Sequence, residues 1–214
     1  YHTGFGSHIE SESLPNVLPQ GQNNPQKVNY GLYAEQLSGT AFTVPRLKNQ
    51  RTWLYRIRPS VVHNAFEGPI SHTGDLSSDM NGSYVITPRQ LRWSPFEVSD
   101  IGDSNVDFVD GLKAKCGAGD AALKDGMCIY NYVFNANMLS GDKGDNKVMC
   151  NADGDFLIVP QQGTLLISTE MGKMQVEPQE ICVIPRGIKF SINRIGEEDF
   201  ARGYVCEIFR GHFE

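Results

Sequence analysis

The chain has no long hydrophobic run and no surplus of positive charge. Among its 214 residues, no uninterrupted apolar stretch exceeds five residues, whereas a membrane-spanning helix needs about 20. The formal net charge is −6, and no basic cluster is interleaved with aromatic residues. These absences argue against a membrane protein and against an acidic partner such as nucleic acid.

Cysteine and histidine are present but are not spaced as in a common metal or redox motif. The five cysteines lie far apart, and none is at Cys-x-x-Cys spacing. Their odd number, with Cys182 and Cys206 inside apolar runs, favours reduced thiols over a disulfide pair in a secreted protein. The N-terminus shows no cationic segment followed by an apolar one, as a signal peptide would. We therefore expect a cytoplasmic protein.

The sequence also lacks any sustained 3.6-residue period, so long amphipathic helices are not expected. Short apolar or alternating runs instead predict antiparallel strands at 52–62, 84–86, 91–96, 127–134, 156–160, 164–168, 181–184 and 204–209. Residues 106–115 suit a strand or a short helical turn. The expected class is mainly β, a sandwich or jelly roll.

The first 46 residues differ in composition from the rest. They are rich in Gly, Pro, Asn and Ser, and prolines such as Pro15, Pro19 and Pro25 exclude long helices and central strands. Sparse apolar anchors favour an ordered arm that lies on another surface. We expect an extended N-terminal arm at 1–46 and a β domain at 47–214.

A carboxylate and an amide lie among apolar neighbours in this arm, at Glu35 and Gln36. A buried carboxylate needs hydrogen-bond or charge partners. Arginines close in sequence could supply them, at positions 46, 51, 56 and 58. We interpret Glu35 and Arg46 as members of an ion-pair set that locks the arm, rather than as catalytic groups.

Several short motifs resemble known sites but lack a required part. His63 and His72 are separated by a loop and share no fixed geometry. Residues 212–214 form His-x-Glu without the Pro-Cys-x-x-Cys of zinc deaminases, and we expect a strand end there. Residues 151–155 lack the glutamate of a calcium loop and indicate a strand-entry turn. Residues 116–120 lack the P-loop lysine, so we expect a turn, and no histidine is near the first of them to activate its thiol.

Residues 151–191 resemble the core of a cupin-type jelly roll whose metal ligands are missing. Gly163 and Pro185–Gly187 hold the turn positions of the two cupin motifs. Phe156 stands where the first motif has its glutamate, and Phe190 stands where the second has its histidine. Phenylalanine offers no lone pair to a metal, so we predict a metal-free barrel with both rings pointing inward.

A wider set of strings is similar to the N-terminal half of the homogentisate 1,2-dioxygenase family. These strings include Leu18–Gln26 (LPQGQNNPQ), Leu32–Gly39 (LYAEQLSG), Thr52–Ile57 (TWLYRI), Cys116–Asp120 (CGAGD) and Asp153–Gln161 (DGDFLIVPQ). The resemblance implies a cytoplasmic enzyme of tyrosine and phenylalanine catabolism. That enzyme opens homogentisate with O₂ to maleylacetoacetate, uses a mononuclear Fe(II), and assembles as a hexamer, a dimer of trimers.

In that family the iron ligands, two histidines and a glutamate, lie in the C-terminal half, and no position here matches their motifs. The resemblance therefore implies an N-terminal scaffold and oligomer-interface domain with no catalytic or metal-binding residue of its own. Its partners would be its own C-terminal catalytic domain and further copies. The structural or interface candidates are Glu35, Gln36, Arg46, Phe156 and Phe190. Two alternatives remain open: a free-standing, metal-free cupin-like binding module, and an enzyme with an unrecognised site in this barrel.

Overall fold

The computed structural model describes residues 29–41, 43–65, 92, 101, 104–140 and 146–213. They fall into two compact units, one within Tyr1–Glu67 and the other within Gly68–Glu214. The expectations for residues 1–28, for His72 and for the strands at 84–86 and 91–96 lie outside the described residues, position 92 excepted. The described part contains no helix with the length and apolar character that crossing a bilayer requires.

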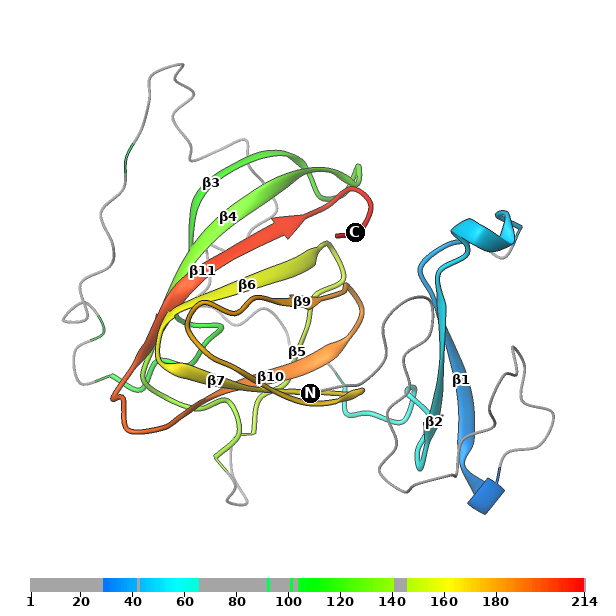
Figure 1. The fold of residues 1–214 in the computed structure, drawn as a ribbon, viewed down its shortest axis with the longest axis horizontal. Helices are drawn as coiled ribbons and strands as arrows, with labels where there is room; N and C mark the ends of the chain where they lie inside the picture. Colours follow the sequence, from blue (N-terminus) through cyan, green and yellow to red (C-terminus); the bar gives the residue numbers. More distant parts are fainter. Residues whose placement is uncertain are drawn as a thin grey trace. The chain divides into compact units, whose positions relative to one another are not determined.

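The first unit contains an antiparallel hairpin, drawn in blue and cyan in Figure 1. Its strands are β1 (Tyr33–Ser38) and β2 (Arg51–Arg56), paired from Tyr33 opposite Arg56 to Ser38 opposite Arg51. Short 3₁₀ turns, η1 (Asn29–Gly31) and η2 (Arg46–Lys48), lie before β1 and between the strands. The boundary that the sequence suggests between residues 46 and 47 falls inside this hairpin.

The second unit consists of two antiparallel sheets. One has the strand order β3-β4-β11-β6-β9 and the other β5-β10-β7-β8. The strand bounds are β3 (Leu112–Asp120), β4 (Asp125–Phe134), β5 (Met149–Cys150), β6 (Asp155–Gln162), β7 (Thr164–Thr169), β8 (Gly172–Val176), β9 (Cys182–Ile184), β10 (Lys189–Ile195) and β11 (Ala201–Ile208).

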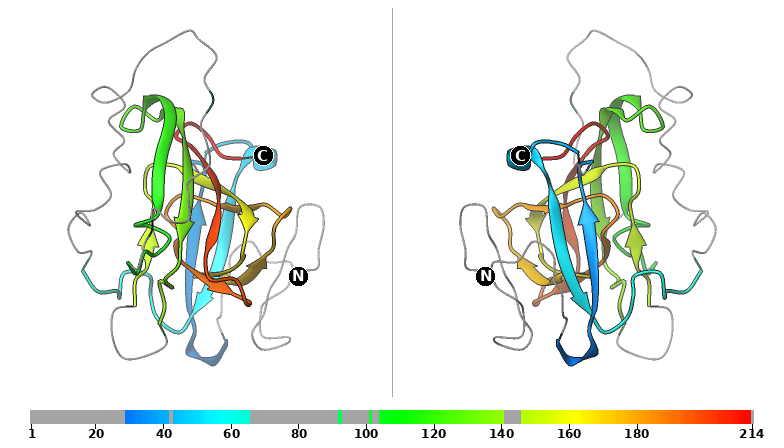
Figure 2. Two further views of the ribbon diagram at one scale, coloured as in Figure 1. Left: turned by 90° about the vertical axis from the view of Figure 1, so that its left-hand side faces the viewer. Right: turned by 90° about the vertical axis from the view of Figure 1, so that its right-hand side faces the viewer.

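The strand pairing is that of a jelly roll. Strand β4 pairs with β11, β5 with β10, β6 with β9, and β7 with β8. The chain from β4 to β11 is thus one long ribbon folded back on itself, and its successive strand pairs alternate between the two sheets. This winding closes both sheets around a single core, and Figure 2 shows β11 (red) running beside β4 (green). The expected jelly roll is confirmed.

Most of the strands expected for the second unit are present, but one interpretation is wrong. Residues 116–120, expected as a turn, form the second half of β3 and pair with β4 as far as Asp120 opposite Asp125. The glycines there remain in a strand because β4 supplies a ladder partner for each of them. The turn lies instead at residues 121–124. Strands β5, β8 and β10 were not expected from their short or mixed sequences.

Aromatic rings connect the two sheets through the core. Phe156 of β6 and Phe190 of β10 are each 1% exposed. Their ring centroids are 6.3 Å apart at an interplanar angle of 68°, close to edge-on. Because β6 and β10 belong to different sheets, this contact joins the sheets directly. The prediction that both rings point into the barrel agrees with their burial.

Candidate functional site

Aromatic rings occupy the two positions of the barrel interior where a metal-binding cupin carries its ligands. Phe156 contacts Phe190 on one side and Tyr130 of β4 on the other, at a centroid distance of 6.2 Å. Among the described residues, no group of three or more His, Cys, Asp and Glu side chains could hold a metal ion. Since Fe(II) needs several nitrogen or oxygen donors around it, the described part of this interior does not fit an iron site.

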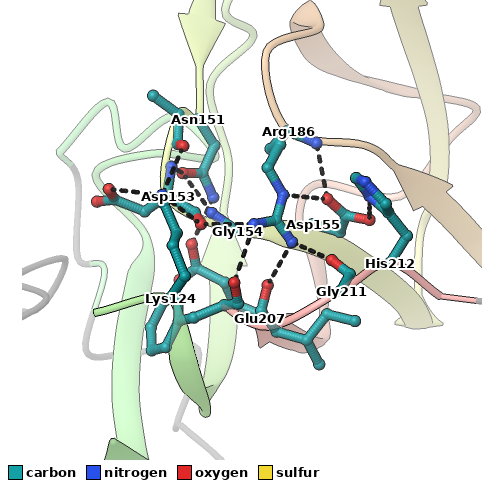
Figure 3. A network of polar contacts seen from close by, with 12 residues as sticks. Lys124, Asn151, Asp153, Gly154, Asp155, Arg186, Glu207, Gly211 and His212 are labelled. Atoms are coloured by element: carbon teal, nitrogen blue, oxygen red, sulfur yellow. Dashed lines mark hydrogen bonds and ion pairs between the residues drawn. The ribbon is translucent and has the colours of Figure 1, made fainter. Parts of the chain in front are cut away.

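The most developed polar arrangement lies at the start of β6 (Figure 3). The Asp155 side chain is 1% exposed. Its Oδ1 accepts hydrogen bonds from the backbone N–H of Arg186 at 3.0 Å and from the Arg186 Nε at 2.9 Å, and its Oδ2 lies 2.8 Å from Nδ1 of His212. Burial alone would raise the pKa of Asp155, but the donors of Arg186 and His212 outweigh it and hold that pKa below its usual value.

The Arg186 guanidinium also connects the turn between β9 and β10 to the chain that follows β11. It donates hydrogen bonds to the backbone carbonyls of Phe209 at 2.9 Å and Asp153 at 3.3 Å, and to that of Gly211. Planar guanidinium donors suit several carbonyl acceptors at once. Arg186 and Asp155 thus fasten residues 209–212 to the start of β6 and to a turn of the barrel.

A second buried carboxyl, Glu207 of β11, lies beside this arrangement and points inward. Its Oε2 accepts the Tyr130 hydroxyl at 2.7 Å, and its Oε1 accepts the Asn151 amide at 2.5 Å. Burial raises the pKa of Glu207, and these two neutral donors offset only part of that effect. A hollow of about 40 Å³ borders Glu207, Tyr130 and Phe156. That volume suits a few water molecules at most, so it cannot take an aromatic substrate.

The cysteines are free, and the pKa shifts of their thiols do not favour nucleophilic chemistry. Burial raises the pKa of the Cys116 thiol, and it raises those of Cys128 and Cys182 to about 11. A thiol with a raised pKa is largely protonated near neutral pH and therefore a weak nucleophile.

An expected ion pair of the first unit is present, and its arginine is Arg56, one of the four that the sequence offers. Oε2 of Glu35 lies 3.1 Å from Nε of Arg56, and each side chain is 17% exposed. The Ser60 backbone N–H donates to Oε1 of Glu35 at 2.7 Å, and the Ser60 hydroxyl donates to Oε2. Gln36 is exposed and pairs across the hairpin with Trp53. The Arg46 side chain lies outside the described part of the chain, and the interface roles of these residues remain predictions.

Other sequence expectations have mixed outcomes. The strand-entry turn at 151–155 is confirmed, because Oδ1 of Asn151 accepts the backbone N–H of Asp153 at 2.9 Å. His63 is an exposed loop residue whose Nδ1 lies 2.6 Å from a neighbouring carbonyl oxygen. The strand end expected at residues 212–214 is wrong, because β11 ends at Ile208 and His212 contacts the buried Asp155.

Sequence reasoning missed the Asp155–Arg186–His212 arrangement altogether. Its members are separated by 31 and 57 positions from Asp155. No local pattern connects residues at such separations. The available signal was an aspartate directly before an apolar strand, which requires a partner once buried.

Comparisons with known proteins agree with the strings noted in the sequence. The family model described as "Homogentisate 1,2-dioxygenase N-terminal" matches residues 1–214. Homogentisate 1,2-dioxygenase from Homo sapiens is 49% identical over 221 residues, which covers 100% of this chain and 46% of that protein. The Dictyostelium discoideum protein of the same name is 50% identical over 214 residues, with 100% and 46% covered. The chain thus spans slightly less than half the length of these relatives.

Among solved structures, an RmlC-like cupin family protein from Methanocaldococcus jannaschii aligns with 12% identity and a TM-score of 0.37. That alignment covers 56% of this chain and 93% of that one, and a similarity this low supports no conclusion. The family model, in contrast, covers every residue of the chain. The chain therefore belongs to the homogentisate 1,2-dioxygenase N-terminal family.

Proposed function

We propose that this chain is the N-terminal scaffold domain of an Fe(II)-dependent homogentisate 1,2-dioxygenase. The complete enzyme would open the homogentisate ring with O₂ to give maleylacetoacetate, in the catabolism of tyrosine and phenylalanine. The observation that carries this proposal is the match of the family model to all 214 residues. Because the chain covers only 46% of the human relative, the remaining length leaves room for a second domain that holds the iron.

The described part of the barrel supports a structural rather than a catalytic role for this half. Phe156 and Phe190 fill the interior without offering a donor atom, and the hollow beside Glu207 measures about 40 Å³. The buried carboxyls of Asp155 and Glu207 are both engaged by hydrogen bonds within the domain. Reaction chemistry would therefore reside in residues beyond this chain.

We also propose the partners and the compartment that follow from this role. The domain would pack against its own C-terminal catalytic domain and contribute to a homo-oligomer, a hexamer formed as a dimer of trimers in the cytoplasm. Its formal charge of −6 supports the proposal that acidic polymers are not among its partners.

The test compares the full-length gene product with the 214-residue chain. The full-length protein is expected to contain iron by elemental analysis, to consume O₂ only when homogentisate is added, and to form maleylacetoacetate. The 214-residue chain is expected to do none of these. Iron binding or ring opening by the short chain would favour an enzyme site within this barrel instead.

The same experiment distinguishes the proposed function from the alternative of a free-standing binding module. A cupin-like binding module would have a native polypeptide mass close to 23.7 kDa, the mass of this chain. A native product of that mass without homogentisate-dependent O₂ uptake would contradict the proposed function.

A further inference from the structure

The outward face of the five-stranded sheet carries an apolar row across all of its strands. The strand register places one outward residue of each strand beside the next, and these are Cys116, Ile129, Cys206, Leu157 and Val183. The row follows the strand order β3-β4-β11-β6-β9 (Figure 1). At about 4.8 Å per strand it spans roughly 19 Å. None of its members is charged.

This face continues into a second partly apolar row. Tyr204 of β11 lies opposite Val159 of β6, and both are half-buried. Ile181, just before β9, is 65% exposed, and Val183 is 37% exposed. An antiparallel sheet that faces water normally alternates apolar residues inward with polar residues outward. Here apolar residues lie on both faces of the sheet.

The outward face of the four-stranded sheet is more polar, and part of it is already covered within the domain, since Ser191 is 3% exposed and Asn193 bonds the backbone of Leu139. One outward row there consists of Lys173, Ser168 and Ser191, and the next consists of Gln175, Leu166 and Asn193. Both sheets enclose the same core, so burial of the core cannot explain the difference. The five-stranded sheet thus presents the more apolar of the two outward faces.

The chain leaves the barrel on this same side of the sheet. Asp155 and Leu157 are two residues apart in β6, so their side chains point to one face, the outward one. Because His212 and Arg186 contact Asp155, residues 209–212 are held over the end of that face (Figure 3). The next part of a longer polypeptide would begin there.

We propose that this outward face, formed by the rows of Leu157 and Val159, is the docking surface for the polypeptide that follows residue 214 in the complete enzyme. The inference rests on the proposed function, because it requires that longer chain. The relatives are more than twice as long as this chain, so a second domain of comparable size is available.

The direct test places a photo-reactive benzophenone amino acid at Val183 in the full-length enzyme. The control places it at Gln175, on the outward face of the four-stranded sheet. After irradiation, mass spectrometry is expected to find position 183 linked to residues beyond 214, at least fivefold more than position 175. Oligomers assembled from isotope-labelled and unlabelled subunits show whether each link lies within one chain. Links from position 183 to another copy, or no links, would overturn the proposal.

A pair of matched substitutions provides a second readout. Leu157→Lys places a charge on the proposed docking surface, and Leu166→Lys places the same charge on the outward face of the other sheet. In the full-length enzyme, Leu157→Lys is expected to accelerate iodoacetamide labelling of Cys206 at least tenfold, whereas Leu166→Lys changes it less than twofold. The core thiol of Cys128, 0% exposed, stays unlabelled if the domain remains folded. Equal labelling of Cys206 in the two variants would contradict the proposal.

Failure of this inference is distinguishable from failure of the proposed function. Homogentisate-dependent O₂ uptake is measured on the same unmodified enzyme preparation. Turnover of homogentisate without a link from position 183 would contradict the docking surface but agree with the proposed function. A link from position 183 without turnover would agree with the docking surface but contradict the proposed function.

Discussion

Replacing Asp155 with asparagine would remove the central charge of the polar arrangement that fastens the end of the chain. The substitution keeps the size of the side chain but exchanges one acceptor oxygen for a donor amide. The three donors that now face the carboxylate, the backbone N–H and Nε of Arg186 and Nδ1 of His212, lie 2.8 to 3.0 Å from it. The new amide N–H₂ group of the asparagine would then face hydrogen-bond donors instead of acceptors, in a site that is 1% exposed.

The expected cost follows from breaking a buried pair while one charge remains. Removing one partner of a buried ion pair costs about 3–5 kcal/mol. Arg186 keeps its hydrogen bonds to backbone carbonyls and is 20% exposed, so we expect the lower end, about 3 kcal/mol. In a domain of this size, that loss lowers Tm by roughly 6–12 °C.

Urea unfolding followed by far-ultraviolet circular dichroism measures the loss, and Asp153→Asn is the matched control. Asp153 lies two residues earlier, its side chain is 53% exposed, and its oxygen is 4.0 Å from Nζ of Lys124. An exposed pair of this kind contributes less than about 1 kcal/mol. The control should therefore unfold close to the wild type, whereas Asp155→Asn should unfold at clearly lower urea concentration.

The pH dependence of the difference provides a further check. The pKa of Asp155 is lower in the folded chain than its usual value, which is about 3.9 when unfolded. The carboxylate therefore stabilises the fold fully above that value, and this stabilisation is lost as the pH falls through the lower folded pKa. The difference in unfolding free energy between wild type and Asp155→Asn should narrow below about pH 4. Equal unfolding of both variants at pH 7, or a gap that does not narrow at all as the pH falls below about 4, would refute this reasoning.

Four further substitutions test other parts of the barrel. Phe190→Ala should lower the free energy of unfolding by about 3–5 kcal/mol, because it opens a cavity between the sheets; a loss below about 1 kcal/mol in urea unfolding would show that the ring is dispensable. Tyr130→Phe removes a donor to Glu207 and should cost about 1–2 kcal/mol at neutral pH. Since the folded pKa of Glu207 is raised, its carboxyl becomes neutral in the folded chain as the pH falls through that pKa, so the part of the cost that comes from the charge should be lost there. Gly111→Ala places a Cβ 2.1 Å from a backbone oxygen of β4 and should cost about 3 kcal/mol or more. Gly187→Ala meets open space at a φ of +83° and should cost only about 1–2 kcal/mol, so similar Tm values for the two variants would contradict the steric argument.

Local signals in the sequence were sufficient for much of the fold. The apolar runs that became β6, β7 and β9 are bounded by turn residues and have the length of strands, so their period and flanks decided their structure. The absence of metal donors at Phe156 and Phe190 could also be read directly, because it depends on residue type alone. The short sequence strings shared with the family indicated the same relationship that the family model shows over residues 1–214.

Other features depended on which strands become neighbours. The glycine-rich segment 116–120 is a strand only because β4 lies beside it. The residues of the segment do not by themselves predict a strand. Strand β10 has mixed polarity because its outward residues face a polar surface while Phe190 enters the core.

The sequence by itself thus determined the class of fold, the family and the chemistry that the interior lacks, since each depends on residue types and spacing along the chain. Only the tertiary structure decided that Asp155, Arg186 and His212 meet, and that five apolar side chains form a row on an outward face. Both arrangements join residues far apart in sequence through strand pairing. That pairing is set by the closure of two sheets around one core, which no local pattern encodes.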